Sequence, residues 1–473
     1  MDTVIGVRPR EAESAGVESP PLAVPPEWRA RLERRALAPL AGTGWRYYAW
    51  IGALLAVIGW AIFAYARQVD EGLIVTGMRD RISWGLYIAS FVFFIGISHA
   101  GTLLSAILRV TRARWQLSVT RMAEFITVVA LMVGALMPFI DMGRPDRVLN
   151  LFLYGRWQSP LMWDIFAIST YLTGSTIYLY LPLIPDFALA RDRLGPTAAP
   201  WKRWFLTTAA LGWTGSPAQR HLLDRAMTIM MIVIIPVAVS VHTVVSWIFA
   251  MTLRVPFNTS IFGAYFVAGA IFSGIAAIVL LMVVLRKLLH LEDYITERQF
   301  VFLGYLLAAL AGVMVYMNVS EYVTHGYKME EGVNFHFNQL MVGPFAPLFW
   351  SYVAGVVFPA LIVLFRRTRT IAGIVTASVV VLVVMWFERY LIVVTGLRVP
   401  LMPYEPREYF PSWVELSILV GAFALFALLI SLFAKLFPVI SVWEVVEHRG
   451  PEPRWQGTAE PASRAARPEV TNP

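Results

Sequence analysis

The sequence predicts an all-α membrane protein with ten transmembrane helices, arranged as two related four-helix bundles with one further helix at each end. Three observations support this class. Ten largely apolar stretches of about 20 or more residues are each long enough to cross a hydrocarbon layer of about 30 Å. The mean hydropathy is +0.63, and 58% of the residues are hydrophobic. Only 15% are charged, whereas soluble domains carry about a quarter.

Short basic or polar connectors separate the predicted spans. The spans are residues 46–66, 82–108, 119–140, 161–184, 226–251, 260–285, 299–319, 342–365, 371–395 and 413–434. Before the first span, Glu27 to Arg35 combines arginines with a tryptophan and a leucine, which is typical of a helix lying on a membrane surface. The last residues, Gly450 to Pro473, are rich in Pro, Glu and Arg. They are predicted to be disordered or bound along a partner.

Lysine and arginine are distributed unequally between the two sets of connectors. If both termini lie on one side, that side holds 28 basic residues and the opposite side holds 10. Because cytoplasmic loops carry the excess of basic residues, we expect both termini in the cytoplasm of a bacterium and the odd-numbered loops in the periplasm. The net charge of +8 does not indicate nucleic-acid binding, because the arginines lie between apolar spans and suit contacts with anionic membrane lipid.

Short motifs recur in the two halves of the chain. Trp84–Tyr87 and Phe262–Tyr265 open spans two and six, and Leu253–Pro256 after span five resembles Leu397–Pro400 after span nine. This indicates two related four-helix units, although chance similarity in apolar sequence is an alternative. The predicted segments are 1–45 (cytoplasmic), 46–66 (peripheral span), 82–251 (first bundle), 260–395 (second bundle), 413–434 (peripheral span) and 435–473 (cytoplasmic tail). Repeat-built membrane proteins often place binding sites at bundle centres or repeat interfaces.

Ionisable side chains are expensive to insert into hydrocarbon, so each one in or near a span is a candidate functional residue. These candidates are His99, Asp164, His242, Glu388 and Arg389, with Asp141, Arg144 and Glu321 at span ends. Most lie toward the expected periplasmic ends, where acids and imidazoles could release protons to that side. Counting residues along the spans places His99 about 12 Å deeper than His242. That separation argues against a haem held between them.

Each candidate also has a purely structural interpretation. Asp164 follows a Ser-Pro pair that begins helices well, so its carboxylate could complement a helix dipole. The two histidines lie among serines and threonines, whose hydrogen bonds can join neighbouring helices. Glu388 and Arg389 could form structural ion pairs with other helices. The candidates at span ends could lie in solvated turns.

The chain contains no cysteine. Disulfides, thiolate metal sites and cysteine-bound iron–sulfur clusters are therefore excluded within it. We expect no haem and no metal site in this chain either. A protein of this composition can still bind a lipid-soluble two-electron carrier and present it to a partner's redox centre.

Seven motifs occur in order along the spans. They are Ser83–Tyr87, Gly96–Leu103, Gly143–Pro145, Ser159–Asp164, Ser240–Ser246, Tyr265–Gly274 and Met385–Arg389. As a set they resemble the NrfD/polysulfide-reductase family of membrane subunits, and within it the larger quinol-binding membrane subunit of alternative complex III. The resemblance implies a subunit that holds menaquinol near the periplasmic face. Its implied partners are a periplasmic iron–sulfur/molybdopterin-like subunit, c-type cytochrome subunits and a second related membrane subunit.

Several positions of this chain match motif residues of that family. They are His99, Arg144, Asp164, His242, Glu388 and Arg389. Two departures stand out: Asp141-Met142 occupies the place of a frequent histidine, and Trp247-Ile248-Phe249 occupies the place of a frequent aspartate. The missing acid leaves open which carboxylate accepts the quinol proton.

Quinol oxidation removes two electrons and two protons, so a site needs proton acceptors, a proton exit and an apolar slot. We predict that catalysis involves Asp164, His242, Glu388 and Arg389, and that menaquinol binding involves His99, Asp141, Arg144, Tyr171, Tyr265 and Glu321. In this scheme His242 or Asp164 contacts the head group, and His99 could belong to a proton path through the first bundle. The alternatives are a structural or proton-conducting subunit without quinone, or a secondary transporter.

Overall fold

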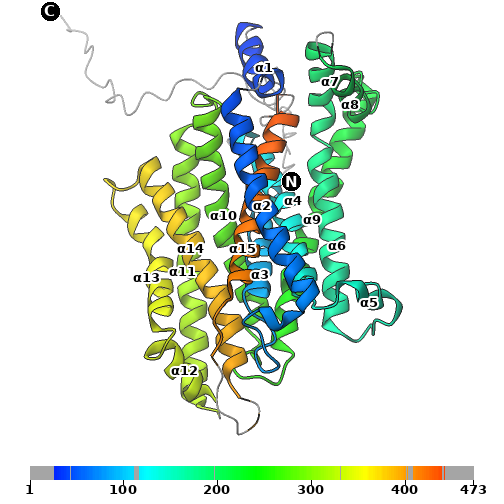
Figure 1. Cartoon of the computed structure of the whole chain (residues 1–473). Coiled ribbons are helices and arrows are strands. Elements are labelled where there is room, and N and C mark those ends of the chain that lie inside the picture. The colour runs from blue at the N-terminus through cyan, green and yellow to red at the C-terminus, as the bar shows by residue number, and fades with distance from the viewer. Residues whose placement is uncertain are drawn as a thin grey trace, which may run out of the picture.

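The computed structural model describes residues 26–42, 44–110, 117–195, 198–330, 332–400, 402, 408–438 and 441–442. In this part of the chain the regular structure is helical, apart from an isolated bridge between Arg79 and Ile82. Long helices run side by side along one direction (Figure 1). The predicted all-α membrane class is therefore confirmed. The predicted disordered stretch from Gly450 to Pro473 lies outside the described residues.

Nine helices within the described ranges are long and apolar enough to cross a membrane. They are α2 (Trp45–Glu71), α3 (Leu86–Val110), α4 (Leu117–Asp141), α9 (Pro217–Ala250), α10 (Phe262–Leu288), α11 (Glu297–Lys328), α13 (Ala346–Leu364), α14 (Ile371–Arg398) and α15 (Trp413–Leu436). Each overlaps one predicted span. The remaining predicted span, 161–184, overlaps α6 (Pro160–Tyr180), which has the necessary length but carries Asp164 and many hydroxyl groups. A tenth crossing by α6 stays a prediction.

The starts of several long helices follow from capping chemistry. Ser412 Oγ accepts a hydrogen bond from the Glu415 amide at 3.3 Å, and Glu415 Oε2 accepts one from the Ser412 amide at 2.8 Å. This reciprocal pair satisfies amide groups that the first helical turn leaves free. Ser216 caps α9 with Pro217 in the first helical position, which is why this helix begins nine residues before the predicted span 226–251.

Shorter helices gather at the two ends of the long ones (Figure 1). At one end, called the α1 end, lie α1 (Pro26–Ala41), α7 (Leu183–Leu194) and α8 (Pro200–Ala209). At the other, called the α12 end, lie α5 (Asn150–Leu153) and α12 (Val333–Met341). Helix α1 contains the predicted surface helix and buries one face, with Leu32, Ala36 and Leu40 at helical spacing.

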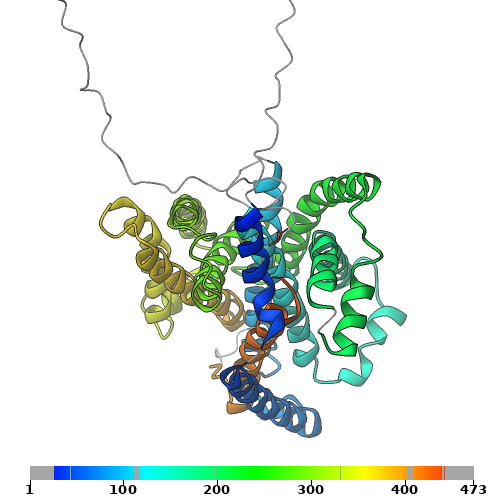
Figure 2. The same cartoon turned by 90° about the horizontal axis from the view of Figure 1, so that it is seen from above.

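The long helices contact one another in two rings of four. In the first ring α3 contacts α4, α4 contacts α6, α6 contacts α9, and α9 returns to α3. In the second ring α10 contacts α11, α11 contacts α13, α13 contacts α14, and α14 returns to α10. Helix α10 also packs against α3 and α9, so it forms the junction between the rings. Viewed from above, the rings lie on opposite sides and α2 lies outside them (Figure 2). The common origin of the two rings stays a prediction.

Helices α2 and α15 form a peripheral pair held by small residues and by indole hydrogen bonds. A Cβ atom added at Gly421 of α15 would overlap Ala61 of α2. On the same interface the Trp60 indole donates to Ser417 Oγ at 3.0 Å, and the Trp50 indole donates to Ser431 Oγ at 3.1 Å. Close approach through small residues is a common way for helices to associate in lipid.

We expect Gly421→Val to separate this pair and to lower the stability of the protein by roughly 1–3 kcal/mol, as overpacking does elsewhere. Thermal unfolding of the purified protein measures the effect. Gly59→Val is the matched control, because a Cβ at Gly59 on α2 meets nothing within 4 Å. Equal melting temperatures for the two variants would contradict the prediction.

Candidate functional site

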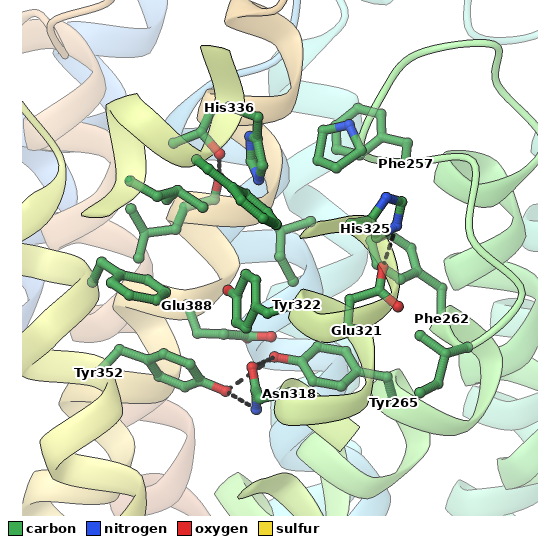
Figure 3. A pocket seen from close by; sticks show the side chains of 18 residues that line it. Phe257, Phe262, Tyr265, Asn318, Glu321, Tyr322, His325, His336, Tyr352 and Glu388 are labelled. Atoms are coloured by element: carbon green, nitrogen blue, oxygen red, sulfur yellow. Dashed lines mark hydrogen bonds and ion pairs between the residues drawn. The ribbon is translucent and has the colours of Figure 1, made fainter. Parts of the chain in front are cut away.

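A pocket lies inside the second ring near the α12 end (Figure 3). Its walls come from α10, α11, α12, α13, α14 and the loop before α10. The free cavity volume is about 70 Å³, which is room for several waters. Aromatic and aliphatic side chains form most of the wall. The polar residues among them are Tyr265, Asn318, Glu321, Tyr322, His325, His336, Tyr352, Glu388 and Thr395.

Two tyrosine hydroxyls and one amide form a hydrogen-bonded group at one side of the pocket. The hydroxyl oxygens of Tyr265 and Tyr352 are 3.0 Å apart. Asn318 Nδ2 donates to the Tyr352 hydroxyl at 2.8 Å and to the carbonyl of Met314, one turn earlier, at 2.7 Å. The carboxylate of Glu388 points toward the Tyr265 hydroxyl (Figure 3). The pocket therefore brings a carboxylate and two hydroxyls together in an apolar setting.

Glu388 and Arg389 are both almost completely buried, with 3% and 1% of their surface exposed. Arg389 Nη1 lies 3.1 Å from Glu388 Oε2. The guanidinium stacks on the Phe266 ring at 4.9 Å and lies against Gly269, where an added Cβ would be 2.6 Å from Nη2. The expectation that these neighbours pair with other helices is wrong, because α10 seats the guanidinium beside Glu388. Within the described residues Arg389 Nη2 has no hydrogen-bond partner.

His99 and His242 form a buried ring pair in the first ring of helices, with centroids 3.9 Å apart. His99 Nδ1 is hydrogen-bonded to the Ile95 carbonyl at 3.0 Å, and His99 Nε2 is hydrogen-bonded to the Ala238 carbonyl. The predicted depth difference of about 12 Å is wrong, because the ends of α3 and α9 are staggered. A difference in depth therefore does not exclude a haem, although two imidazole rings in contact leave no space for iron between them. Tyr171 packs on His99, with ring centroids 5.0 Å apart.

The histidine pair and the Glu388–Arg389 pair both lie close to one aromatic side chain, Phe266. Phe266 of α10 has its centroid 6.4 Å from that of His242 and 4.9 Å from the Arg389 guanidinium. Both ring nitrogens of His242 are buried and have no hydrogen-bond partner among the described side chains and backbone. The junction between the two rings of helices thus holds the buried Arg389 guanidinium and the His242 imidazole, whose nitrogens have no hydrogen-bond partner among the described residues.

A second acidic group lies at the wall formed by α11. Glu321 Oε1 is 2.9 Å from His325 Nε2, and Glu321 Oε2 accepts a hydrogen bond from Thr259 Oγ1 at 3.0 Å. On α12, Gln339 donates to His336 Nδ1 at 3.4 Å. Burial and the neighbouring His325 lower the pKa of His336 to about 3, so its imidazole is neutral at pH 7.

Of the ten predicted site residues, Tyr265, Glu321 and Glu388 line the pocket, and the other seven do not. Besides Arg389 and the His99–His242–Tyr171 group, these are Asp164, Asp141 and Arg144. Asp164 on α6 is buried, and its Oδ1 has no partner in the described structure. Asp141 ends α4 and likewise keeps a buried oxygen without a partner there. Arg144 is exposed and binds Asp146 through two hydrogen bonds of 3.0 and 2.9 Å, as expected for a solvated turn.

Sequence reasoning missed Asn318, Tyr352 and His336. Asn318 was detectable as an amide within an apolar span, since its side chain needs partners there. Tyr352 gives no such signal, because tyrosines are common near membrane interfaces. His336 lies on α12, a nine-residue helix that is too short to be recognised as a span.

Buried polar residues continue from the histidine pair toward the α1 end. Tyr171 donates to the Ser98 carbonyl at 3.1 Å, and Ser105 Oγ donates to Glu124 Oε1 at 2.8 Å. Ser105 also lies 3.2 Å from the Tyr178 hydroxyl. Farther along, Arg121 of α4 pairs with Asp186 of α7, and both are at most 2% exposed. We call this series the polar file of the first ring; its residues are His99, Ser98, Tyr171, Thr102, Ser105, Glu124, Tyr178, Arg121 and Asp186.

The chain is similar to membrane subunits of redox enzymes over most of its length. The family model described as polysulphide reductase, NrfD, matches residues 74–400. A protein of Halobacterium salinarum, provisionally named as a membrane subunit of dimethyl sulfoxide reductase, is 28% identical over 86% of this chain and 94% of its own length. A selenate reductase subunit of Mesobacillus selenatarsenatis is 26% identical over 86% and 98%. The Hdr-like menaquinol oxidoreductase integral membrane subunit of Archaeoglobus fulgidus is 24% identical over 86% and 98%.

Proposed function

Because the chain belongs to the NrfD polysulphide reductase family, we propose that it is the quinol-oxidising membrane subunit of a multi-subunit oxidoreductase of the alternative complex III type. It is a multi-pass membrane protein that acts with redox partner subunits rather than alone. The relatives named as membrane subunits of reductases and of a menaquinol oxidoreductase support this role. The substrate we propose is menaquinol.

The pocket of the second ring is the observation that carries the proposal. A quinol ring needs an apolar slot with few, well-placed polar groups. Here Glu388 and the Tyr265–Tyr352 hydroxyls face the slot from α14, α10 and α13, and Glu321 with His325 faces it from α11. Two carboxylates on different helices provide one acceptor for each hydroxyl proton of a quinol.

The proposed reaction divides its tasks between two polypeptides. The quinol gives two electrons to the redox centre of a partner subunit, which supplies the electron-accepting chemistry. Glu388 accepts one proton, and the adjacent Arg389 stabilises its carboxylate form before each turnover. Glu321 and His325 accept the second proton and pass it toward the α12 end.

We further propose that the α12 end faces the periplasm and that both termini are cytoplasmic. The 28-to-10 distribution of lysine and arginine supports this orientation. Protons would then leave on the periplasmic side. The polar file would connect the opposite side to the histidine pair, and so offer a route for proton uptake or translocation.

The same polar file favours one alternative function, a proton-conducting membrane subunit that binds no quinol. Its buried carboxylates Glu124 and Asp186 and the Ser105 hydroxyl bonded to Glu124 are typical of proton relays. In that case the pocket of the second ring would hold only water. Blocking the pocket distinguishes the two functions.

We expect Ile392→Trp to fill the pocket and to lower the kcat/KM for menaquinol oxidation at least ten-fold, roughly the result of losing 1.4 kcal/mol of binding. Ile392 lines the pocket and is only partly buried, so the larger ring is tolerated. Steady-state oxidation by the purified complex and competition by a quinone analogue are the measurements. Val379→Trp, on the exposed face of the same helix, is the control. Unchanged kinetics and inhibitor binding in Ile392→Trp would support the proton-conducting alternative.

A further inference from the structure

A second, larger cavity lies on the lipid-facing side of the molecule. It has a volume of about 590 Å³ and is lined by α2, α3, α4, α10, α14 and α15. We call it the groove. Apart from the indole groups of Trp50 and Trp386, Ser431 is its polar lining residue. The Ser431 hydroxyl is already used, since it accepts from the Trp50 indole and donates to the Ala427 carbonyl at 2.7 Å. The groove therefore suits hydrocarbon and not a polar head group.

Two cations lie just beyond the groove, at the α1 end. Arg46 precedes the lining residue Trp50 by four positions on α2, and Lys287 follows the lining residue Val284 by three positions on α10. At these spacings each cation lies on the same helix face as its lining neighbour. Both side chains are exposed, and neither makes an ion pair with another described residue. The apolar groove thus ends at two exposed positive charges that are free to bind an anion.

We propose that the groove binds one anionic phospholipid, with its acyl chains along α10 and α15 and its phosphate at Arg46 and Lys287. Basic sites at the ends of transmembrane helices bind anionic head groups, and each lysine or arginine contributes about a factor of five in affinity. Exposed aromatic rings at Trp45 and Tyr48 lie at the same level, as is typical of the lipid head-group region. The site is separate from the quinol pocket and does not depend on the proposed function.

Two other occupants fit these observations less well. A partner helix would meet the two cations only if it carried an acidic side chain at that level, whereas every anionic phospholipid carries its charge next to its acyl chains. The isoprenoid tail of a quinol has no anionic group to place between the two cations. The groove and the pocket also share no lining residue, because different residues of α10 and α14 line each of them.

The bound lipid would have a structural consequence. Helices α2 and α15 pack chiefly against each other and against α3 and α4. The groove is the space between this peripheral pair and helices α10 and α14 of the second ring. A lipid in the gap joins the peripheral pair to that ring.

The experiment measures rebinding of dioleoyl phosphatidylglycerol and dioleoyl phosphatidylcholine to the delipidated complex, by mass spectrometry of the intact assembly. We expect one tightly bound phosphatidylglycerol per copy of this chain. The double variant Arg46→Gln/Lys287→Gln should bind it roughly 25-fold more weakly, about five-fold for each charge. Val284→Trp, a groove-filling change at a 47% exposed position, should abolish binding.

Matched controls leave the groove intact. Arg225→Gln/Arg298→Gln removes two exposed charges that are not beside the groove lining, and Val313→Trp enlarges an exposed side chain of α11. Both should bind lipid like the wild type. Equal phosphatidylglycerol binding in all variants, or equally tight phosphatidylcholine binding to the wild type, would overturn the proposal. So would displacement of the lipid by menaquinone, or loss of a protein subunit from Val284→Trp without any change in lipid.

Discussion

Replacing Glu388 by glutamine is expected to lower the kcat of menaquinol oxidation about 100-fold or more, with a much smaller change in KM. The carboxylate is the buried proton acceptor closest to the Tyr265–Tyr352 hydroxyls, and glutamine keeps its shape but cannot accept a proton. Loss of a general base typically lowers rates by a factor of 10² to 10⁴. Steady-state kinetics of the purified complex measure the effect.

Glutamine also leaves the Arg389 guanidinium without its anionic neighbour, so assembly must be checked separately. Size-exclusion chromatography and the subunit composition of the purified complex show whether the variant subunit is incorporated. Glu388→Asp keeps the charge and should retain a substantial part of the activity. Glu292→Gln, at an exposed position, is the control for removing a carboxylate. Full activity in an assembled Glu388→Gln complex would contradict the assignment.

Asp164→Asn tests the competing position in the first ring. Asp164 does not line the pocket, but its buried oxygen without a partner in the described residues is the feature expected of a proton acceptor. If Asp164→Asn or His242→Gln stops oxidation and Glu388→Gln does not, the quinol head group binds in the first ring. The proposed pocket would then be wrong, while the membrane-subunit role would stand.

Hydropathy located the long helices well, because the thickness of a bilayer fixes the length of an apolar span. Nine predicted spans correspond to helices such as α10, and α6 differs through its hydroxyl groups and Asp164. What the sequence could not provide is the relative height of different helices. The contact between His99 and His242 depends on how far α9 is shifted along α3. No residue count within one span contains that information.

The residues of the candidate site were predictable to different extents. Glu388 and Arg389 are prominent in the sequence, since ionisable residues within an apolar span are rare. Their pairing with each other depends on α10, where Phe266 and Gly269 make space for the guanidinium. Such a space arises from two helices that are distant in sequence. Local pattern therefore identified the charges and could not identify their partners.

The second large effect is expected at the α1 end, where Arg121→Met should destabilise the protein by about 3–5 kcal/mol, the usual result of breaking a buried ion pair. Arg121 is 2% exposed and pairs with Asp186, which is 1% exposed. It also donates to the Pro182 carbonyl at 2.7 Å and to Ser441 Oγ at 3.0 Å. One side chain thus connects α4 with α7 and with the chain after α15. Thermal unfolding of the purified protein measures the loss.

The double variant Arg121→Met/Asp186→Leu separates pairing from packing. In Arg121→Met alone, the buried Asp186 carboxylate loses the Arg121 guanidinium, and this is the larger part of the expected loss. Removing both charges should restore most of the lost stability, because a buried ion pair contributes little beyond what apolar side chains of similar size provide. A double variant that is as unstable as the single one would show that the hydrogen bonds of Arg121 to Pro182 and Ser441 dominate. If the polar file carries protons, the restored double variant should still lose proton translocation, so this pair separates stability from conduction.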